Sequence, residues 1–199
     1  MKTLFTELVT SLRATLVLAM VLCGLYPVAI WAGGQLLFRD KANGSLVFDG
    51  DGTLRGSRLL AQRFTSDGYF NPRPSSAGTG YDAANSAGSN LGPTSQKLAD
   101  AIKADVATYR EKNGLPAATP VPADAVTRSA SGLDPHISVA NAELQAGRVA
   151  RARQLPLATV RSLIAQHTDD RNAGILGEPG VNVLLLNRAL DAAKPASSR

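Results

Sequence analysis

The sequence has a single cysteine and two histidines among its 199 residues. Cys23 lies inside an uncharged apolar segment, so the chain has no disulfide of its own, no thiolate metal site and no soluble cysteine nucleophile. No carboxylate stands at helical ligand spacing from His136, and His167 lies in a different segment. The sequence therefore predicts no metal site.

Motifs for nucleotide chemistry and catalysis are also missing. There is no Gly-x-x-x-x-Gly-Lys-Ser/Thr phosphate loop, and the glycine pair at 78–80 lacks the third glycine of a dinucleotide fingerprint. Ser131, Asp134 and His136 carry the side-chain types of a hydrolase triad, but residues so close in one loop seldom have triad geometry. We predict no catalytic residue, and a membrane-anchored serine hydrolase using Ser131 or Ser86 stays open as the remote alternative.

A strong charge of one sign is absent as well. The chain carries 21 basic and 16 acidic residues, a net charge of +5 at pH 7, which is too mild a balance to indicate nucleic-acid binding. Basic residues are spread out except within residues 144–168, where Arg148, Arg151, Arg153 and Arg161 meet no acidic residue. We interpret this run as a solvated helix face or a contact with an acidic partner, and a phosphate site is the alternative.

One long hydrophobic segment dominates what is present. Residues 14–38 contain no charge and, at about 1.5 Å of rise per residue, are long enough to cross a hydrocarbon core of about 30 Å. We predict a stub over 1–13, a transmembrane helix over 14–38, a soluble domain over 39–193 and a flexible tail over 194–199. A cleaved signal peptide is the alternative, although signal cores usually run only about 7–15 residues before the cleavage site.

Small residues are frequent in the second half of this span, which contains Gly24, Gly33 and Gly34 around a kink expected at Pro27. Because helices in a membrane associate by close packing of small residues, we expect this strip to contact another membrane helix. Basic residues flank the span on both sides, so their count leaves the orientation open. The short N-terminal stub favours a cytoplasmic N-terminus with the soluble domain outside.

The soluble segment alternates short strands and helices, which predicts a mixed α/β (α+β) single domain. Residues 45–48 are expected to form a strand, 54–64 a second strand or extended segment, and 65–93 a loop-rich region. Thr94 is expected to cap a helix that ends at 113–114 and presents one apolar face.

Later segments give three further expectations. Ser138 is predicted to cap a helix that reaches about Arg153, and Pro156 to open the next helix. Residues 181–185 alternate like a strand and are expected to precede a short helix from Asn187.

Five motifs stand in order along the chain: YFNPRPS at 69–75, SAGSNLGPT at 86–94, SGLDPHIS at 131–138, RVARAR at 148–153 and LGEPGVNVLLLN at 176–187. With these motifs after an N-terminal span, the chain resembles the C subunit of the bacterial Kdp potassium-transporting P-type ATPase. Three positions differ from the family pattern: Asn71 stands where histidine is usual, Ala87 replaces a glycine, and Gly180 stands where arginine is common.

The resemblance implies a noncatalytic, single-span subunit of a complex in the bacterial inner membrane. With the orientation that the short stub favours, its N-terminus would be cytoplasmic and its domain periplasmic. Its implied partners are a channel-like potassium-binding subunit, a P-type ATPase subunit and a small peptide subunit. One implied role is assembly together with catalytic chaperoning, in which the chain promotes ATP binding by the ATP-hydrolysing subunit. The other is an extracytoplasmic cap on the potassium-binding subunit without nucleotide contact. No covalently bound cofactor is implied, and ATP would be reached through the complex.

Two sets of loop residues are the candidate site. The glycine-serine loop could receive an anion through backbone N–H groups, hydroxyls and a helix N-terminus, or form a turn that only caps the helix; its residues are Ser86, Gly88, Ser89, Asn90, Gly92 and Thr94. The second set is predicted to face a partner subunit or to fix its own loops by hydrogen bonds, and comprises Arg73, Asp134, His136 and Ser138.

Overall fold

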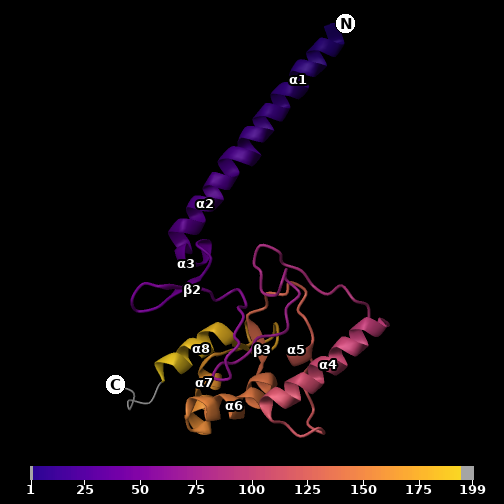
Figure 1. Cartoon of the computed structure of the whole chain (residues 1–199). Coiled ribbons are helices and arrows are strands. Elements are labelled where there is room, and N and C mark those ends of the chain that lie inside the picture. Colours follow the sequence, from indigo (N-terminus) through magenta and orange to yellow (C-terminus); the bar gives the residue numbers. More distant parts are fainter. Residues whose placement is uncertain (1, 194–199) are drawn as a thin grey trace. The chain divides into compact units, whose positions relative to one another are not determined.

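The computed structural model describes residues 2–193 and contains two compact units, Met1–Ser57 and Arg58–Arg199. One apolar helix near the N-terminus is followed by mixed helix and sheet, as the sequence predicts (Figure 1). The sequence-based boundary at residue 39 separates the span from the soluble segment, whereas the contacts between residues divide the chain after Ser57. The tail expected to be flexible, 194–199, lies outside the described residues.

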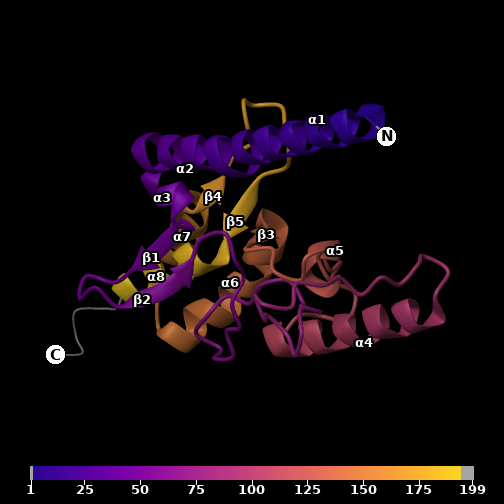
Figure 2. The same ribbon diagram turned by 90° about the horizontal axis from the view of Figure 1, so that it is seen from above.

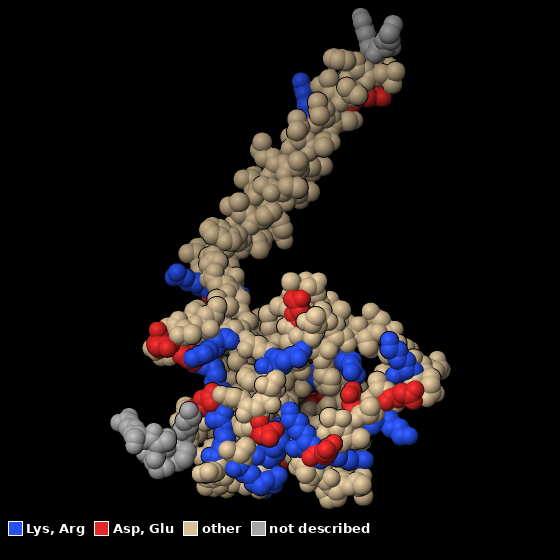
Figure 3. Space-filling model, in the orientation of Figure 1, with Lys and Arg blue, Asp and Glu red and all other residues tan. Residues whose placement is uncertain are grey.

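The first unit begins with a continuous helix, Thr3–Leu37, which is long enough for a membrane span and contains an 18-residue window with a mean hydropathy of 2.1. It consists of α1 (Lys2–Ala19), a π-helical segment η1 (Met20–Leu25) and α2 (Tyr26–Leu37). The helix therefore also includes most of the segment treated as a stub. Figure 3 shows the middle of this helix without charged side chains, as the uncharged sequence 14–38 requires.

The π-helical segment lies directly before Pro27. The backbone N–H of Tyr26 donates to the carbonyl of Val21, five residues back. Proline has no N–H, and its ring crowds the carbonyl four residues before it. A widened turn is one way for a helix to accommodate this crowding. Before Pro27 the structure therefore shows a change of hydrogen-bond pattern, while the expected kink stays a prediction.

After the span, a short helix α3 (Arg39–Ala42) leads into an antiparallel hairpin of β1 (Leu46–Phe48) and β2 (Leu54–Ser57). The first strand was predicted within a residue. The second ends at Ser57 and does not extend to residue 64, because β1 offers only three residues for pairing. The Ser57 hydroxyl instead donates to the carbonyl of Gly44 at 2.7 Å, which closes the hairpin.

The second unit contains a three-stranded antiparallel sheet with the order β3 (His136–Ser138), β5 (Gly180–Asn182) and β4 (Thr168–Asp169), visible in Figure 2. Ile137 pairs with Val181 at the centre of the sheet. Both side chains are almost fully buried, so the sheet contributes its middle residues to the core.

The helices of this unit are α4 (Gln96–Asn113), α5 (Ala123–Val126), α6 (Val139–Arg153), α7 (Leu157–Gln166) and α8 (Val183–Ala192). Helices α5, α6 and α8 contact the sheet, whereas α4 packs on α5 and α6. The core lies mainly between α6, α7, α8 and the sheet, and Phe70 joins it from the long loop region. Its largest apolar side chains are Phe70, Ile137, Val149, Val160, Ile164, Val181, Leu186 and Leu190.

Helix α4 ends where the sequence predicts, at Asn113, with Gly114 in the left-handed conformation at φ 64°. Its start is one residue later than predicted. Ser95 occupies the N-cap position, so the expectation that Thr94 caps this helix was wrong, and Ser95 makes no side-chain cap bond either. The four apolar residues expected on one face, Leu98, Ile102, Val106 and Tyr109, are all partly buried.

The cap of α6 is confirmed, because the Ser138 hydroxyl accepts a hydrogen bond from the Asn141 N–H at 3.1 Å. Pro156 lies at the N-cap of α7, also as expected. The predicted strand 181–185 was too long: β5 ends at Asn182, whose side chain accepts from Leu185 N–H and starts α8 four residues before Asn187.

The reason for that error is the spacing of buried residues after β5. Alternation would bury Val183 and Leu185 and expose Leu184 and Leu186. In the structure Val183, Leu184 and Leu186 are all buried and Leu185 is only partly buried, a pattern that a helix can bury and a strand with one solvent face cannot.

Candidate functional site

Three loops that the sequence analysis singled out meet around Ser131 and Gly132. The Ser75 hydroxyl donates to the carbonyl of Gly132 at 2.6 Å. From the glycine-serine loop, the Ser86 hydroxyl and the Ala87 N–H both donate to the carbonyl of Ser131 at 3.0 Å. We call this meeting point the loop junction and define it as residues 73–77, 86–88 and 129–134.

Two glycines allow the backbones to approach this closely. A Cβ atom on Gly132, which has φ 68°, would lie 2.6 Å from the carbonyl oxygen of Ala87 and 2.8 Å from the nitrogen of Ala77. A Cβ atom on Gly88 would lie 2.9 Å from the carbonyl oxygen of Ala130. Both positions require glycine, because a side chain would separate the loops.

Arg73 and Asp134 form an ion pair across the loop junction. Arg73 Nη1 lies 3.0 Å from Asp134 Oδ2, with 23% and 31% of the two side chains exposed. Asp134 Oδ1 also accepts the His136 N–H at 3.0 Å. Arg73 Nε is buried and has no hydrogen-bond partner among the described residues. Both predicted interface residues thus have partners within the chain, while a part of each remains exposed.

The hydrolase triad is not assembled. His136 Nε2 lies 3.0 Å from Asp169 Oδ2, so the ring contacts the end of β4. The Ser131 hydroxyl instead accepts the Leu133 N–H at 3.1 Å. Ser86 already donates to a backbone carbonyl. Neither candidate serine is hydrogen-bonded to a histidine, so the geometry offers no activated nucleophile at these residues.

Ser138 serves the fold through two kinds of contact. Besides capping α6, its hydroxyl donates to Asp124 Oδ1 at 2.8 Å and its N–H donates to Asp124 Oδ2 at 2.8 Å. Asn141 Nδ2 donates to the same carboxylate at 2.9 Å. Asp124 therefore ties α5 to the start of α6, and the Ser138 side chain has little capacity left for a partner.

The remainder of the glycine-serine loop is open. Ser89, Asn90, Gly92 and Thr94 are exposed, and Asn90 has φ 52°. A Cβ atom on Gly92 would contact nothing within 4 Å. The glycine-serine loop, which the sequence offered as a possible anion site, is therefore divided. Ser86 and Ala87 are hydrogen-bonded inside the loop junction, whereas Ser89, Asn90, Gly92 and Thr94 are exposed ahead of α4.

A buried polar network next to the loop junction escaped the sequence analysis. Arg148, predicted on a solvated helix face, is only 5% exposed. Its Nε donates to Asn113 Oδ1 at 3.0 Å, its Nη1 to the carbonyls of Asp67 and Tyr69, and its Nη2 to Gln145 Oε1 at 2.9 Å. Burial lowers the pKa of this guanidinium from its ordinary value.

Amide side chains extend this network. Gln145 Oε1 accepts the N–H of Asn71 at 2.8 Å and Gln145 Nε2 donates to the carbonyl of Asn71 at 3.1 Å. In the same way, Asn187 holds both backbone groups of Phe70. These contacts join residues more than seventy positions apart, so no local sequence pattern could have revealed them. They fix the start of the loop 69–75 on α6 and α8.

Two further arginines of the basic run, Arg153 and Arg161, have defined contacts. Arg153 lies over the ring of Tyr69 at 4.5 Å and pairs with Asp191 at 2.8 Å. Arg161 pairs with Glu143 at 2.9 Å. Of the four arginines in this run, only Arg148 is buried, so the prediction of a solvated face was wrong for that residue.

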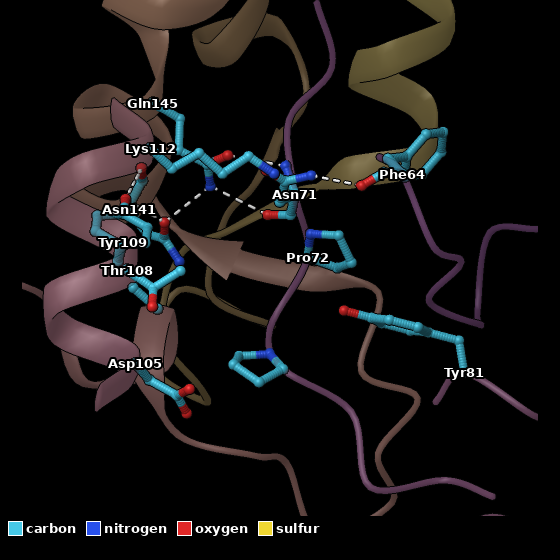
Figure 4. Close-up of a pocket in the computed structure, with 12 residues that line it drawn as sticks. Phe64, Asn71, Pro72, Tyr81, Asp105, Thr108, Tyr109, Lys112, Asn141 and Gln145 are labelled. Carbon is cyan, nitrogen blue, oxygen red and sulfur yellow. Dashed lines mark hydrogen bonds between the residues drawn. The ribbon is translucent and has the colours of Figure 1, made fainter. Parts of the chain in front are cut away.

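A cavity of about 250 Å³ lies between α4 and the loop 71–74. Figure 4 shows Tyr109 and Asn141 on its α4 and α6 side and Pro72 on the loop. Burial, reinforced by the charge of Asp124, raises the pKa of Tyr109. Burial and the nearby Arg148 lower the pKa of Lys112. Within residues 2–193, no group of three or more histidine, cysteine or carboxylate side chains is placed to hold a metal ion.

In the span, the predicted packing residues do not form one strip. Gly24 and Gly33 are nine positions apart, about two and a half helical turns, so they lie on nearly opposite sides of the helix. A Cβ atom on either would contact nothing within 4 Å in the described chain, whereas one on Gly34 would lie 3.7 Å from Ala42 Cβ in α3. Gly24 and Gly33 therefore offer two separate smooth patches.

Comparison with known proteins identifies the family. The model of the KdpC family, described as the c chain of K⁺-transporting ATPases, matches residues 8–192. The potassium-transporting ATPase KdpC subunit of Mycobacterium tuberculosis is 55% identical over 185 residues, covering 93% of this chain and 97% of the relative. The corresponding subunits of Myxococcus xanthus and Koribacter versatilis are 54% and 50% identical. The alignment covers 94% of this chain and 89% of the Myxococcus subunit, and 95% of this chain and 96% of the Koribacter subunit. The chain therefore belongs to the KdpC family of subunits of potassium-transporting ATPases.

Proposed function

We propose that this chain is a noncatalytic subunit that assists assembly of the potassium pump and acts as a catalytic chaperone promoting ATP binding by the ATP-hydrolysing subunit. Its partners in this proposal are that P-type subunit, the channel-like potassium-binding subunit and a small peptide subunit. The chain would contact them through its single span in the bacterial inner membrane and through the exposed side of the loop junction.

The loop junction is the observation that carries this proposal. Ser75, Ala87 and the Arg73–Asp134 pair hold the neighbouring loops 73–77 and 86–88 to the loop 129–134, more than forty positions further along the chain. The polar network around Arg148 also fixes the start of the loop 69–75. A polar surface that is rigid before binding loses little entropy when a partner docks. The same residues contain no assembled catalytic group, which favours a docking role over chemistry.

Reversal of the Arg73–Asp134 pair tests the docking role. We compare Arg73→Glu, Asp134→Arg and the double variant for thermal stability and for retention on a complex immobilised through the ATP-hydrolysing subunit. Each single variant places like charges together and should lower both readouts. The double variant restores an ion pair inside the chain but inverts the charges shown to a partner. It should therefore recover stability without recovering retention.

The Arg128–Asp105 pair provides a matched control. Its side chains are 27% and 31% exposed and its atoms lie 3.0 Å apart, close to the values for Arg73 and Asp134. The reversed double variant at this pair should retain both stability and subunit retention. Full recovery of retention by the reversed Arg73–Asp134 pair would show that this pair serves only the fold.

A second candidate function is an extracytoplasmic cap on the potassium-binding subunit without nucleotide contact. The bonding of Ser86 and Ala87 to Ser131 supports it, because these donors are not free to receive a phosphate. In this arrangement the N-terminus lies in the cytoplasm and the domain in the periplasm. Alkaline phosphatase fused to the C-terminus should then be active in cells. An inactive fusion would put the domain on the cytoplasmic side of the membrane, where ATP is available, and would contradict the cap.

A further inference from the structure

The hairpin after the span exposes one apolar face. Leu46, Phe48 and Leu54 are 41%, 51% and 52% exposed, whereas Val47 between the first two is 8% exposed. Phe48 pairs with Leu54 across the hairpin, and Leu46 lies two residues before Phe48 on the same strand. The register shifts by one residue between Val47 and Phe48. The exposed–buried–exposed pattern of β1 and the direct pairing of Phe48 with Leu54 beyond the shift nevertheless place all three side chains on the same side of the two strands. We call this surface the hairpin face.

The hairpin is joined closely to the end of the membrane helix. The Gln35 side chain of α2 hydrogen-bonds the Asn43 side chain through both amides, at 3.2 and 3.4 Å. Asn43 Nδ2 also donates to the carbonyl of Arg39, and the N–H of Ser45 donates to the carbonyl of Asp40 at 2.9 Å. The chain thus folds back at α3, and the first strand starts one residue beyond this fastened turn.

The helix, α3 and the hairpin belong to one compact unit, and Figure 1 shows the hairpin leaving the end of α2 to one side. The uncharged span ends at Phe38, and Arg39 and Lys41 follow directly. Charged residues at this position mark the water-facing end of a span. The hairpin face therefore starts within a few residues of the level at which the helix leaves the hydrocarbon.

The charges around the hairpin favour apolar insertion over electrostatic attraction. Residues 39–57 contain three basic and three acidic residues, and Arg55 pairs with Asp49 on the hairpin itself. Such a balanced segment gains little from an anionic surface. An apolar face beside a span, in contrast, gains by entering the boundary between headgroups and acyl chains.

We propose that the hairpin face is a lipid-binding surface that lies in the membrane interface beside the end of the span. Leu46, Phe48 and Leu54 enter the boundary between headgroups and acyl chains, while the turn at 49–53 stays in water. The Asn43 side chain joins the hairpin to α2 through its hydrogen bonds with Gln35. Lipid contact by the hairpin therefore fixes the depth and rotation of the helix end. Neutral and anionic phospholipids serve equally well.

Fluorescence from single cysteines in the full chain tests this proposal. Cys23→Ala removes the native thiol, and Leu46→Cys or Leu54→Cys then receives an environment-sensitive dye while Phe48 stays in place. The chain is reconstituted in nanodiscs of phosphatidylcholine, with or without phosphatidylglycerol, that contain lipids with a nitroxide near the headgroup end of the acyl chain. Lys103→Cys, at an exposed position of α4, is the control for a water-facing dye.

Dyes at positions 46 and 54 should show blue-shifted emission and lose most of their intensity to the nitroxide lipids, equally in both bilayers, whereas a dye at 103 should not respond. The same measurement in the assembled pump distinguishes lipid from a protein partner. Unchanged quenching there supports the lipid contact. A water-like spectrum in nanodiscs, or protection from nitroxide lipids only in the assembled pump, would overturn the proposal, the latter in favour of a protein interface.

Discussion

At the residue scale, Arg148 is the side chain on which the position of the candidate site depends most. Its guanidinium donates to acceptors from α4, α6 and the loop 67–71. Arg148 supplies a donor to each of these acceptors, of which Gln145 Oε1 also accepts the Asn71 N–H. Each buried acceptor left without a partner costs about 1–3 kcal/mol.

Arg148→Met should therefore lower the free energy of unfolding by about 3 kcal/mol or more. Chemical denaturation of the full chain in detergent measures this loss. Arg151→Met is the matched control, because Arg151 is exposed on the same helix and its replacement should change stability by less than about 0.5 kcal/mol. Similar losses in both variants would contradict the role given to Arg148.

Tyr109 gives a pH dependence whose sign follows from its surroundings. Its hydroxyl donates to Asn141 Oδ1 at 2.8 Å, and burial raises its pKa above the ordinary value of 10.0. Above about pH 10 the unfolded chain loses this proton while the folded chain keeps it, so stability falls as the pH rises. Below that pH the contribution is complete.

Tyr109→Phe should remove this part of the alkaline loss. The stability advantage of the wild-type chain over the variant should shrink between about pH 8 and about pH 11 in denaturation experiments. A constant difference between wild type and variant across this range would show that the phenol ionises equally in both states.

At the scale of elements, the helix starts show how much a cap contributes. Ser138 accepts from Asn141 N–H and donates to Asp124, whereas Ser95 occupies the same position on α4 without a side-chain bond. Ser138→Ala should cost about 1–2 kcal/mol, and Ser95→Ala less than about 0.5 kcal/mol. Thermal unfolding of both variants checks this, and equal losses would refute the difference.

Elements with a local signal were predictable from the sequence, and elements set by distant contacts were not. The Gly114 cap at the end of α4 and the Ser138–Asn141 cap at the start of α6 each join residues within four positions. The start of α8 was missed because the burial of Leu184 and Leu186 depends on packing against other elements. The position of the loop that Gln145 and Asn187 hold could not be predicted from the sequence for the same reason.

The candidate site shows the same division. The sequence singled out three loops of unusual composition, and the structure brings parts of all three together. The sequence could not indicate that Arg73 and Asp134 pair with each other. It also could not indicate that the backbone at Gly132 lies too close to two other backbone segments for a side chain, or that Arg148 is buried next to these loops. The roles of these residues toward partner subunits remain predictions.

At the scale of the whole molecule, the span offers a test of contacts in the membrane. Gly33 has open space around its Cα, and a leucine there would block close approach of a neighbouring helix. Gly33→Leu should reduce copurification of the pump subunits in mild detergent, while Leu18→Ile, at an exposed position of α1, should not. Equal copurification would argue against packing through this patch.

The central claim is that the pump needs this chain to assemble and to bind ATP well. Its most direct test is the potassium-stimulated ATPase activity of the complex, purified through the ATP-hydrolysing subunit from cells with and without the chain, over a range of ATP concentrations. We predict that without the chain the complex fails to assemble or requires much more ATP for potassium-stimulated hydrolysis. An assembled complex with unchanged activity and unchanged KM for ATP would contradict the account.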